Sequence, residues 1–345
     1  MAILHRSRAP LRLGLAGGGT DVSPYSDEFG GCVLNGTINL YSHCTIVPAG
    51  GATVSFLAPD RGETFQAAAV APLPAAGPLP LHQAVYNRVV RDFHGGRPLP
   101  CQITTYSDAP AGSGLGTSST LVVAILGAFC EWLKLPLGEY EIAHLAFEIE
   151  RLDLGLAGGK QDHYAAAFGG VNFMEFHAGD RVIVNPLRIR PSVLNELQSS
   201  LLLHFTGVSR DSARIISEQM RHVVEKSAAS VNAMHRLKAD AVQMKEHLLR
   251  GELPAFAQVL GRSWEAKKQM AAVISNPQIE AVFDAAMEAG ALSGKVSGAG
   301  GGGFIIFIVD PAKRVAVLRT LNQQQGRVMT CHFTRHGTEG WKINP

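Results

Sequence analysis

The sequence predicts an α+β fold built from two domains. The chain has 345 residues and is 46% hydrophobic, which is enough apolar material for two packed cores. Over residues 186–191, proline and basic residues replace the periodic apolar pattern, so we place one domain over residues 1–188 and a second over 189–345. In the second half predicted strands and helices alternate, which favours helices layered on a sheet.

Apolar and β-branched patterns predict the elements of the first domain. We expect strands over residues 11–15, 39–47, 53–57, 101–106 and 171–176. We expect helices over residues 81–93, 118–133, 138–152 and 162–168, with a surface loop over the alanine- and proline-rich residues 67–80. Glycine and proline stand at the breaks between these segments.

The second domain shows longer helical patterns. We expect strands over residues 200–205, 304–309 and 327–334. We expect helices over residues 211–250, 252–274, 277–290 and 311–325. The sequence contains no internal repeat.

The charge balance excludes two classes of partner. The chain has 31 lysine and arginine residues against 29 acidic residues, a formal net charge of +2, and no basic run. We therefore expect neither nucleic acid nor a membrane surface as a partner. The longest apolar runs, 121–130 and 304–309, are shorter than the ~20 residues of a membrane span, and residues 1–12 lack the apolar region of a secretory signal. A cytoplasmic location is expected.

The cysteines and histidines do not predict a metal centre. The five cysteines are odd in number and show no C-x-x-C spacing, so we expect reduced thiols. The 13 histidines form no metal-spaced set, and each is expected to be structural or exposed.

The most informative segment is P-A-G-S-G-L-G-T-S-S at residues 110–119. Its alternating glycines let successive N–H groups point inward, and its hydroxyl residues precede a helical run whose N-terminus carries partial positive charge. No Walker A sequence or protein-kinase signature occurs, and a capped glycine-rich turn is the alternative. We predict a cradle for a di- or triphosphate formed by Gly112, Ser113, Gly114, Leu115, Gly116, Thr117, Ser118 and Ser119.

A second glycine-rich segment, residues 298–303, fits the dinucleotide pattern G-x-G-x-x-G. The segment precedes a predicted strand, whereas the dinucleotide fingerprint opens a helix and is followed by a ribose-binding acid. We therefore expect a close backbone approach to a ligand or to the other glycine loop.

Acidic residues near glycines supply the remaining candidates. Asp21 follows three glycines and is either a turn residue or a carboxylate that accepts hydrogen bonds from sugar hydroxyls. Glu150 lies on a different helix face from Glu148, which we expect to be a solvated charge. Glu150 is suited to hold Mg²⁺ with a serine hydroxyl of the phosphate cradle. Asp162 is the candidate that orients or deprotonates an acceptor hydroxyl.

Basic residues complete these candidates. We expect Arg12 or Lys160 to stabilise charge that develops beside the acceptor. Residues 205–212 lead from a strand into a helix and carry Ser209 and Arg210. They form either a capping turn or an anion site for a phosphate on the acceptor.

Three motifs in this order resemble the GHMP kinases, named for galactokinase, homoserine kinase, mevalonate kinase and phosphomevalonate kinase. They are A-P-L-R-L-G-L-A-G-G-G-T-D at residues 9–21, the segment 110–119, and K-V-S-G-A-G-G-G-G-F at 295–304. The resemblance spans the chain. It implies an N-terminal domain like the second domain of ribosomal protein S5, a ferredoxin-like C-terminal domain, and ATP and a sugar in the cleft between them.

The resemblance also implies residue roles. It places the magnesium ligands at Ser118 and Glu150, the catalytic aspartate at Asp162 and the basic residue of the first motif at Arg12. Thr117 departs from the family, which often has serine there, but keeps the hydroxyl. The residues expected at the sugar are Gly18, Gly19, Thr20, Asp21, Gly300 and Gly301.

Within the family, A-G-G-G-T-D and residues 158–170 and 206–215 resemble the D-glycero-D-manno-heptose 7-phosphate kinases. This implies ATP- and Mg²⁺-dependent phosphorylation of the anomeric C1 hydroxyl of the heptose 7-phosphate to the 1,7-bisphosphate, on the route to GDP-heptose for surface polysaccharides. A fucokinase- or galactokinase-like enzyme for a non-phosphorylated sugar is one alternative, and a non-catalytic sugar or nucleotide sensor is another. The expected partners are ATP and a sugar phosphate, and a homodimer is left open.

Overall fold

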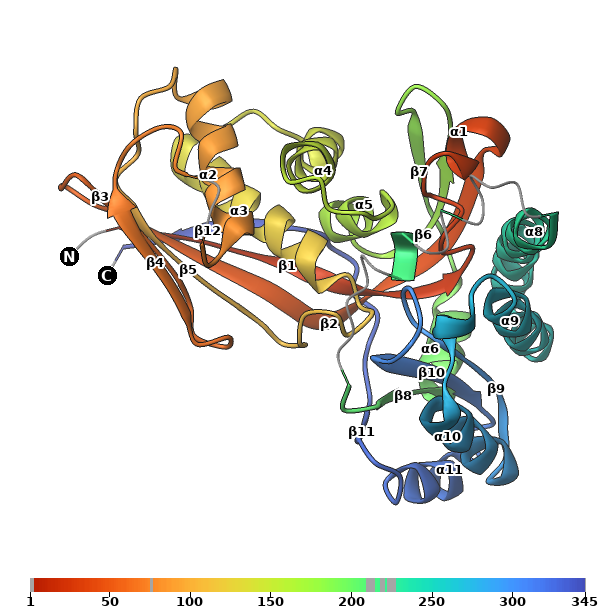
Figure 1. Cartoon of the computed structure of the whole chain (residues 1–345). Coiled ribbons are helices and arrows are strands. Elements are labelled where there is room, and N and C mark those ends of the chain that lie inside the picture. Colours follow the sequence, from red (N-terminus) through yellow and green to blue (C-terminus); the bar gives the residue numbers. More distant parts are fainter. Residues whose placement is uncertain (1–2, 75–76, 209–214, 218–220, 222–227, 345) are drawn as a thin grey trace.

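A computed structural model describes residues 3–74, 77–208, 215–217, 221 and 228–344, and Figure 1 shows its two sheets. Within this part of the chain, an eight-stranded sheet carries helices α2 to α5 on one face, and a four-stranded sheet lies beside its far end (Figure 1). The family resemblance implied two domains that each contain helices and strands, and the two sheets with their helices agree with it.

The larger sheet is mostly antiparallel. The order along its main path is β12-β1-β2-β5-β3-β4, and β6 and β7 extend it from β2. Its strands are β1 (Leu4–Ala16), β2 (Gly31–Pro48), β3 (Thr53–Ala58), β4 (Glu63–Ala68), β5 (Cys101–Ser107), β6 (Val171–Phe176), β7 (Val182–Pro186) and β12 (Glu339–Ile343). The accompanying helices are α1 (Tyr25–Phe29), α2 (Pro80–Phe93), α3 (Thr117–Leu133), α4 (Glu139–Phe147), the π-helical turn η1 (Glu148–Asp153) and α5 (Gln161–Phe168).

The smaller sheet is antiparallel and has the order β11-β8-β10-β9. Its strands are β8 (Leu201–Phe205), β9 (Ala291–Val296), β10 (Phe304–Val309) and β11 (Arg327–Met329). The helices of this half are α6 (Pro191–Ser200), α8 (Ala228–Arg250), α9 (Leu253–Lys268), the 3₁₀ turn η2 (Ala272–Ile274), α10 (Pro277–Glu288) and α11 (Arg314–Leu321).

Strand β1 links the two cores. Its first half packs under the helices of the large sheet, whereas Leu11, Leu13 and Leu15 are fully buried in a cluster that includes Leu203 and Phe304 of the small sheet. The pairing of β1 with β2 shifts register between Pro10 and Arg12. Such irregularities re-aim side chains, and this one lies at the junction of the two sheets.

Helix α3 is apolar on every face and is the central helix of the large layer. Its Leu121, Val122 and Ile125 belong to the core beneath the sheet, as expected for a helix covered all round. Because its N-terminus points toward the small sheet, the segment before Thr117 lies between the two halves (Figure 1).

Most expected elements are present, with three kinds of difference. Strands β4, β7, β9 and β12 and helices α1 and α6 were not predicted. Strand β4 ends at Ala68, so the loop predicted over 67–80 begins two residues later than expected. The predicted helix over 211–250 is described as α8 only from residue 228.

The C-terminal strand crosses back to the first sheet. Leu4 of β1 pairs with Ile343 of β12, and the ladder continues to Arg8 and Glu339. The division at residues 188 and 189 stays a prediction, because the last residues of the chain complete the first sheet. All five cysteines are free thiols, four of them buried. Among the described residues, no helix is both long and apolar enough to cross a membrane.

Candidate active site

The predicted phosphate cradle is a loop that ends on the N-terminus of α3. Gly112, Gly114 and Gly116 adopt φ angles of +72°, +83° and +76°, a region that favours glycine. Helix α3 begins at Thr117, so its free N–H groups face the loop. The structure therefore places the predicted glycines and hydroxyl residues in one anion-binding arrangement.

The second glycine loop packs on the first. A Cβ added to Gly298 would lie 2.7 Å from Gly114 Cα, and one added to Gly303 would lie 2.2 Å from Ser113 O. The Phe304 N–H donates to Ser113 O over 2.9 Å. Of the two alternatives for residues 298–303, the close approach to the other glycine loop is thus observed.

Glu150 forms the centre of a buried polar cluster beside the cradle. Ser118 Oγ donates to Glu150 Oε1 over 2.5 Å, and Ser119 Oγ donates to Oε2 over 2.6 Å. His163 Nε2 lies 2.7 Å from Oε2. Burial raises the pKa of Glu150, but the His163 hydrogen bond and the Arg151 charge outweigh it and hold that pKa below its usual value. An ionised oxygen pair therefore lies at the start of α3.

Arg12 and Asp162 form a bidentate pair. Arg12 Nε and Nη2 both lie 2.7 Å from Asp162 Oδ1, and Arg12 Nη1 donates to Gly114 O over 2.6 Å. A Cβ on Gly116 would lie 3.0 Å from the Asp162 carboxyl group. Asp162 thus lies against the phosphate loop, at the second residue of α5.

Of the two basic residues expected beside Asp162, Arg12 is the one that contacts it. Lys160 was a candidate to act beside Asp162, but its ammonium group pairs with Asp180 over 2.6 Å. Lys160 immediately precedes α5, and its side chain is tied to Asp180. Glu148 pairs with Arg88 and not with the serines that bind Glu150. The two glutamates therefore lie on different faces of the helix, as predicted.

Asp21 joins the first glycine loop to the N-terminus of α5. Its carboxylate accepts hydrogen bonds from the N–H groups of Gly19 (3.1 Å) and Gln161 (3.0 Å) and from Gln161 Nε2 (3.1 Å). Burial raises the pKa of Asp21, and the Gln161 N–H opposes that rise. Asp21 therefore anchors α5, the helix that carries Asp162. Asp21 also lines a cavity beside this helix.

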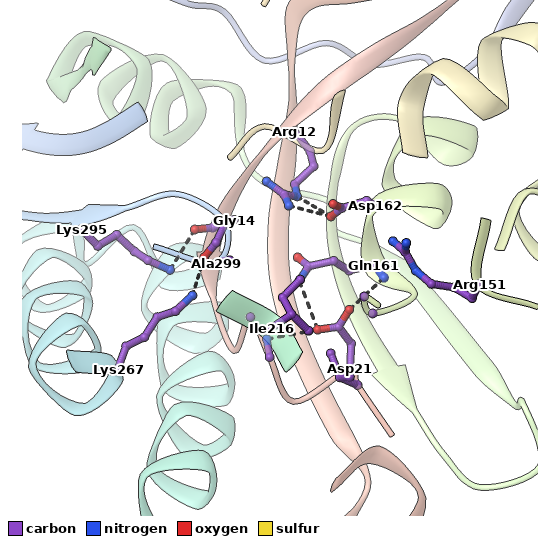
Figure 2. Close-up of a pocket in the computed structure, with 16 residues that line it drawn as sticks. Arg12, Gly14, Asp21, Arg151, Gln161, Asp162, Ile216, Lys267, Lys295 and Ala299 are labelled. Carbon is purple, nitrogen blue, oxygen red and sulfur yellow. Dashed lines mark hydrogen bonds and ion pairs between the residues drawn. The ribbon is translucent and has the colours of Figure 1, made fainter. Parts of the chain in front are cut away.

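Two cavities meet at the Arg12–Asp162 pair. One is lined by the phosphate loop, Ser118, Ser119 and Glu150. The other, shown in Figure 2, is lined by Gly18, Gly19, Asp21, Gln161, Lys267 and Lys295. Residues from both glycine-rich motifs and from α5 therefore surround adjoining spaces, one suited to a polyphosphate and one to a polar acceptor.

Comparison with known proteins gives a consistent result. A family model described as "GHMP kinases N terminal domain" matches residues 81–170, and one described as "GHMP kinases C terminal" matches residues 244–327. A protein of Campylobacter jejuni named D-glycero-alpha-D-manno-heptose 7-phosphate kinase is 47% identical, over 98% of this chain and 99% of its own length. The chain belongs to the GHMP kinase family.

Two further relatives refine this picture. A crystal structure described as a D-glycero-D-manno-heptose 1-phosphate kinase from Bacteroides thetaiotaomicron is 48% identical, covers 99% of this chain and 100% of its own, and superposes with a TM-score of 0.84. The L-fucokinase/L-fucose-1-P guanylyltransferase of Bacteroides fragilis is 30% identical over 92% of this chain and 36% of its own length.

Three of the residues predicted to bind the sugar in this GHMP kinase, Thr20, Gly300 and Gly301, are not among those that line the cavity. The Thr20 hydroxyl is fully buried and donates to Gly17 O (2.8 Å) and Cys32 O (3.0 Å), so it stabilises its own loop. Gly301 N–H donates to Ile274 O over 2.7 Å, and Gly300 also lies against Ile274. Their neighbours Gly298 and Ala299 line the cavity instead. The predicted acceptor-phosphate residues, Ser209 and Arg210, lie outside the described residues.

Sequence reasoning assigned no role to three cavity residues. Lys267 is buried beside Gly298 O, and burial together with the Arg12 charge lowers its pKa to about 8. Gln161 Oε1 is buried and has no hydrogen-bond partner in the part of the chain that the structure describes. Arg151 lines both cavities. Lys267 lies three residues after Trp264 in α9, so the two side chains share one face of the helix. This spacing could have indicated from the sequence that Lys267 is buried.

Proposed function

We propose that this GHMP kinase transfers the γ-phosphoryl group of ATP to the anomeric C1 hydroxyl of D-glycero-D-manno-heptose 7-phosphate and forms the 1,7-bisphosphate. The observation that carries the proposal is the Arg12–Asp162 pair, which lies where a phosphate-loop cavity meets a polar acceptor cavity. The name of the 47% identical Campylobacter relative supports the choice of sugar. ATP as the donor is consistent with a reaction in the cytoplasm.

ATP would occupy two connected spaces. Its phosphates fit the loop of residues 112–119 at the N-terminus of α3. A further cavity of about 420 Å³ begins at Thr117 and Ser118 and extends past Leu81, Tyr106 and Arg327. Its aromatic and aliphatic lining suits a nucleoside, so we assign the base to this side of the loop.

The residues around Glu150 fit a magnesium ion. Mg²⁺ takes hard oxygen ligands and commonly uses one or two protein ligands together with substrate phosphates and water. Glu150 and Ser118 present such oxygens, and no group of three or more acidic, histidine or cysteine side chains suited to a metal occurs among the described residues. When bound, the ion would neutralise charge on the ATP phosphates.

Asp162 would orient and deprotonate the acceptor. The C1 oxygen attacks the γ-phosphorus in line, the bond from phosphorus to the β,γ-bridging oxygen breaks, and ADP leaves with that electron pair. The hydroxyl proton passes to Asp162 Oδ2, because Oδ1 accepts both hydrogen bonds from Arg12. Arg12 also holds Gly114 O, so it fixes the carboxylate relative to the phosphate loop.

The acceptor cavity offers groups for several sugar hydroxyls. Gln161 Oε1 is a free acceptor, and Lys267 is an ammonium group with one protein acceptor, Gly298 O. Gly18 lies between them, since a Cβ there would lie 3.5 Å from Gln161 Nε2 and 4.0 Å from Lys267 Nζ. A pyranose ring can approach this backbone closely because Gly18 has no side chain.

A panel assay tests the proposal. ADP release would be measured with D-glycero-D-manno-heptose 7-phosphate, the free heptose, L-fucose and D-galactose, and the product would be located by ³¹P NMR. We expect the highest kcat/KM for the 7-phosphate and a new phosphate signal at C1. A preference for L-fucose would favour the activity named for the 30% identical Bacteroides relative. ADP release with none of these sugars would favour a sensor.

A further inference from the structure

The junction between the two cavities contains a second arginine. Among the described residues, Arg12 and Arg151 are the cations that line both the phosphate-loop cavity and the acceptor cavity. A phosphoryl group that passes from ATP to the acceptor must cross this junction. Both guanidinium groups are therefore near the reacting phosphorus in any productive complex.

Each nitrogen of Arg12 donates a hydrogen bond within the described part of the protein, and these bonds use three of its five N–H groups. Its Nε and Nη2 bind Asp162 Oδ1 at 2.7 Å, and its Nη1 binds Gly114 O at 2.6 Å. All three nitrogens thus make short, charge-assisted or carbonyl hydrogen bonds. Arg12 is suited to hold Asp162 and the loop in position.

Arg151 is held much more loosely. Its Nη1 lies 3.3 Å from Leu156 O and 3.4 Å from Glu150 Oε1, and its Nη2 lies 3.3 Å from Ser119 Oγ. Its Nε is buried and has no hydrogen-bond partner among the described residues. A guanidinium group with long contacts and one free buried donor retains most of its capacity to bind an anion.

Two local features aim this side chain at the junction. Arg151 lies in the π-helical turn η1, next to Glu150, and such turns occur often at functional sites. Its guanidinium packs on Gly158, where an added Cβ would lie only 2.4 Å from Arg151 Cζ. The glycine therefore leaves room for the guanidinium, and Figure 2 shows Arg151 among the residues that line the acceptor cavity.

We propose that Arg151 is a catalytic residue whose guanidinium group binds the γ-phosphoryl oxygens during transfer. The inference rests on the proposed kinase function. In the step described above, negative charge spreads over the γ-phosphoryl oxygens while the bond to the bridging oxygen breaks, and Arg151 donates hydrogen bonds to those oxygens. The guanidinium exchanges no proton, and its weak contacts to Ser119 and Leu156 are replaced by contacts to phosphate.

The decisive experiment compares Arg151→Gln and Arg151→Lys with the wild type in the ADP-release assay. We expect kcat to fall by about 10²–10³-fold in Arg151→Gln, as for loss of one charge-stabilising donor. The Kd for a non-hydrolysable ATP analogue and the KM for the sugar should each change by less than about threefold, because ground-state contacts remain. Guanidine added to Arg151→Ala should restore part of the lost rate.

A second measurement uses a transition-state mimic. MgADP with aluminium fluoride and the sugar phosphate should form a tight ternary complex with the wild type and a much weaker one with Arg151→Gln. An unchanged kcat, or equal trapping by both proteins, would overturn the inference. If the wild type itself released no ADP with any sugar, the proposed function would fail instead.

Arg88→Gln supplies the matched control. Arg88 binds Glu148 and Asp153, the two ends of η1, from outside both cavities. It tests whether a disturbed turn alone lowers the rate. We expect Arg88→Gln to lose thermal stability while kcat stays within about threefold. Equal losses of kcat in Arg88→Gln and Arg151→Gln would show that Arg151 acts only through the turn.

Discussion

Arg12 directs two of its nitrogens to a single oxygen of Asp162, Oδ1, each at 2.7 Å, and Asp162 lines both cavities. Oδ1 thus fixes the position of the carboxylate, and in the proposed reaction Oδ2 meets the acceptor. Because Arg12 also binds Gly114 O, the position of Asp162 depends on the phosphate loop.

Asp162→Asn should lower kcat by about 10²–10⁴-fold, the usual contribution of a positioned general base. The amide oxygen can still accept from Arg12, so the KM values for ATP and sugar should change little. Asp180→Asn is the control, since Asp180 pairs with Lys160 on the surface. Steady-state kinetics would check this, and a kcat close to the wild type would remove the catalytic assignment.

Glu150→Gln should raise the Mg²⁺ concentration needed for half-maximal activity by at least about tenfold. The amide is nearly isosteric but carries no charge, so Ser118 and the ion lose an anionic partner. Glu148→Gln is the matched control, because Glu148 faces Arg88. A magnesium titration of the rate would show the difference, and identical titrations for Glu150→Gln and the wild type would move the ligand elsewhere.

Gly114→Ala should destabilise the protein by about 3 kcal/mol or more and abolish ATP binding. Its φ is +83°, and the new Cβ would lie 2.4 Å from Ser297 O in the second glycine loop. Gly95→Ala has a similar φ of +62° with no atom within 4 Å, so it should cost only about 1–2 kcal/mol. Urea unfolding and nucleotide titration would measure both; equal costs would mean that the loops do not pack as described.

Lys267→Met should stabilise the protein most below pH 8. Burial lowers the folded-state pKa of Lys267 from 10.5 to about 8, so the folded protein loses this proton before the unfolded chain does. Wild-type stability should therefore rise between pH 8 and 10.5, by as much as about 3 kcal/mol. The advantage of Lys267→Met should shrink over that window.

Urea unfolding at several pH values would test this prediction. Lys134→Met, at a largely exposed lysine, is the control and should show no such trend. A constant difference between Lys267→Met and the wild type from pH 7 to 10 would contradict the lowered pKa. The sugar KM of Lys267→Met should rise, because the acceptor cavity loses an ammonium donor.

Local sequence signals determined the parts of the site whose conformation depends on neighbouring residues. Alternating glycines at 112, 114 and 116 require positive φ, and the hydroxyl residues after them mark a helix start, so the phosphate loop was readable directly. Ser118 was expected beside Glu150, and Arg12 or Lys160 beside Asp162. The structure brings Ser118 to Glu150 and Arg12 to Asp162.

Only the tertiary structure decided which polar side chains face the cavities. Lys267 and Lys268 are adjacent in one helix, yet Lys267 is 3% exposed because α9 packs its Trp264 face inward. The Lys160 ammonium group pairs with Asp180, and the Thr20 hydroxyl donates to Gly17 O within its own loop. The contacts of Lys160 with Asp180 and of Thr20 with Cys32 join segments more than ten residues apart, which composition and periodicity do not encode.

The sequence by itself thus predicted the α+β class and the glycine-rich loop before α3, and it named Arg12 and Asp162 as candidates, because each follows from local backbone preference or from a motif. The tertiary structure decided that β12 returns to pair with β1, that the two glycine loops pack together, and that Arg151 lies loosely held at the junction of the cavities. The physical reason is that burial and hydrogen-bond satisfaction are properties of the packed molecule as a whole.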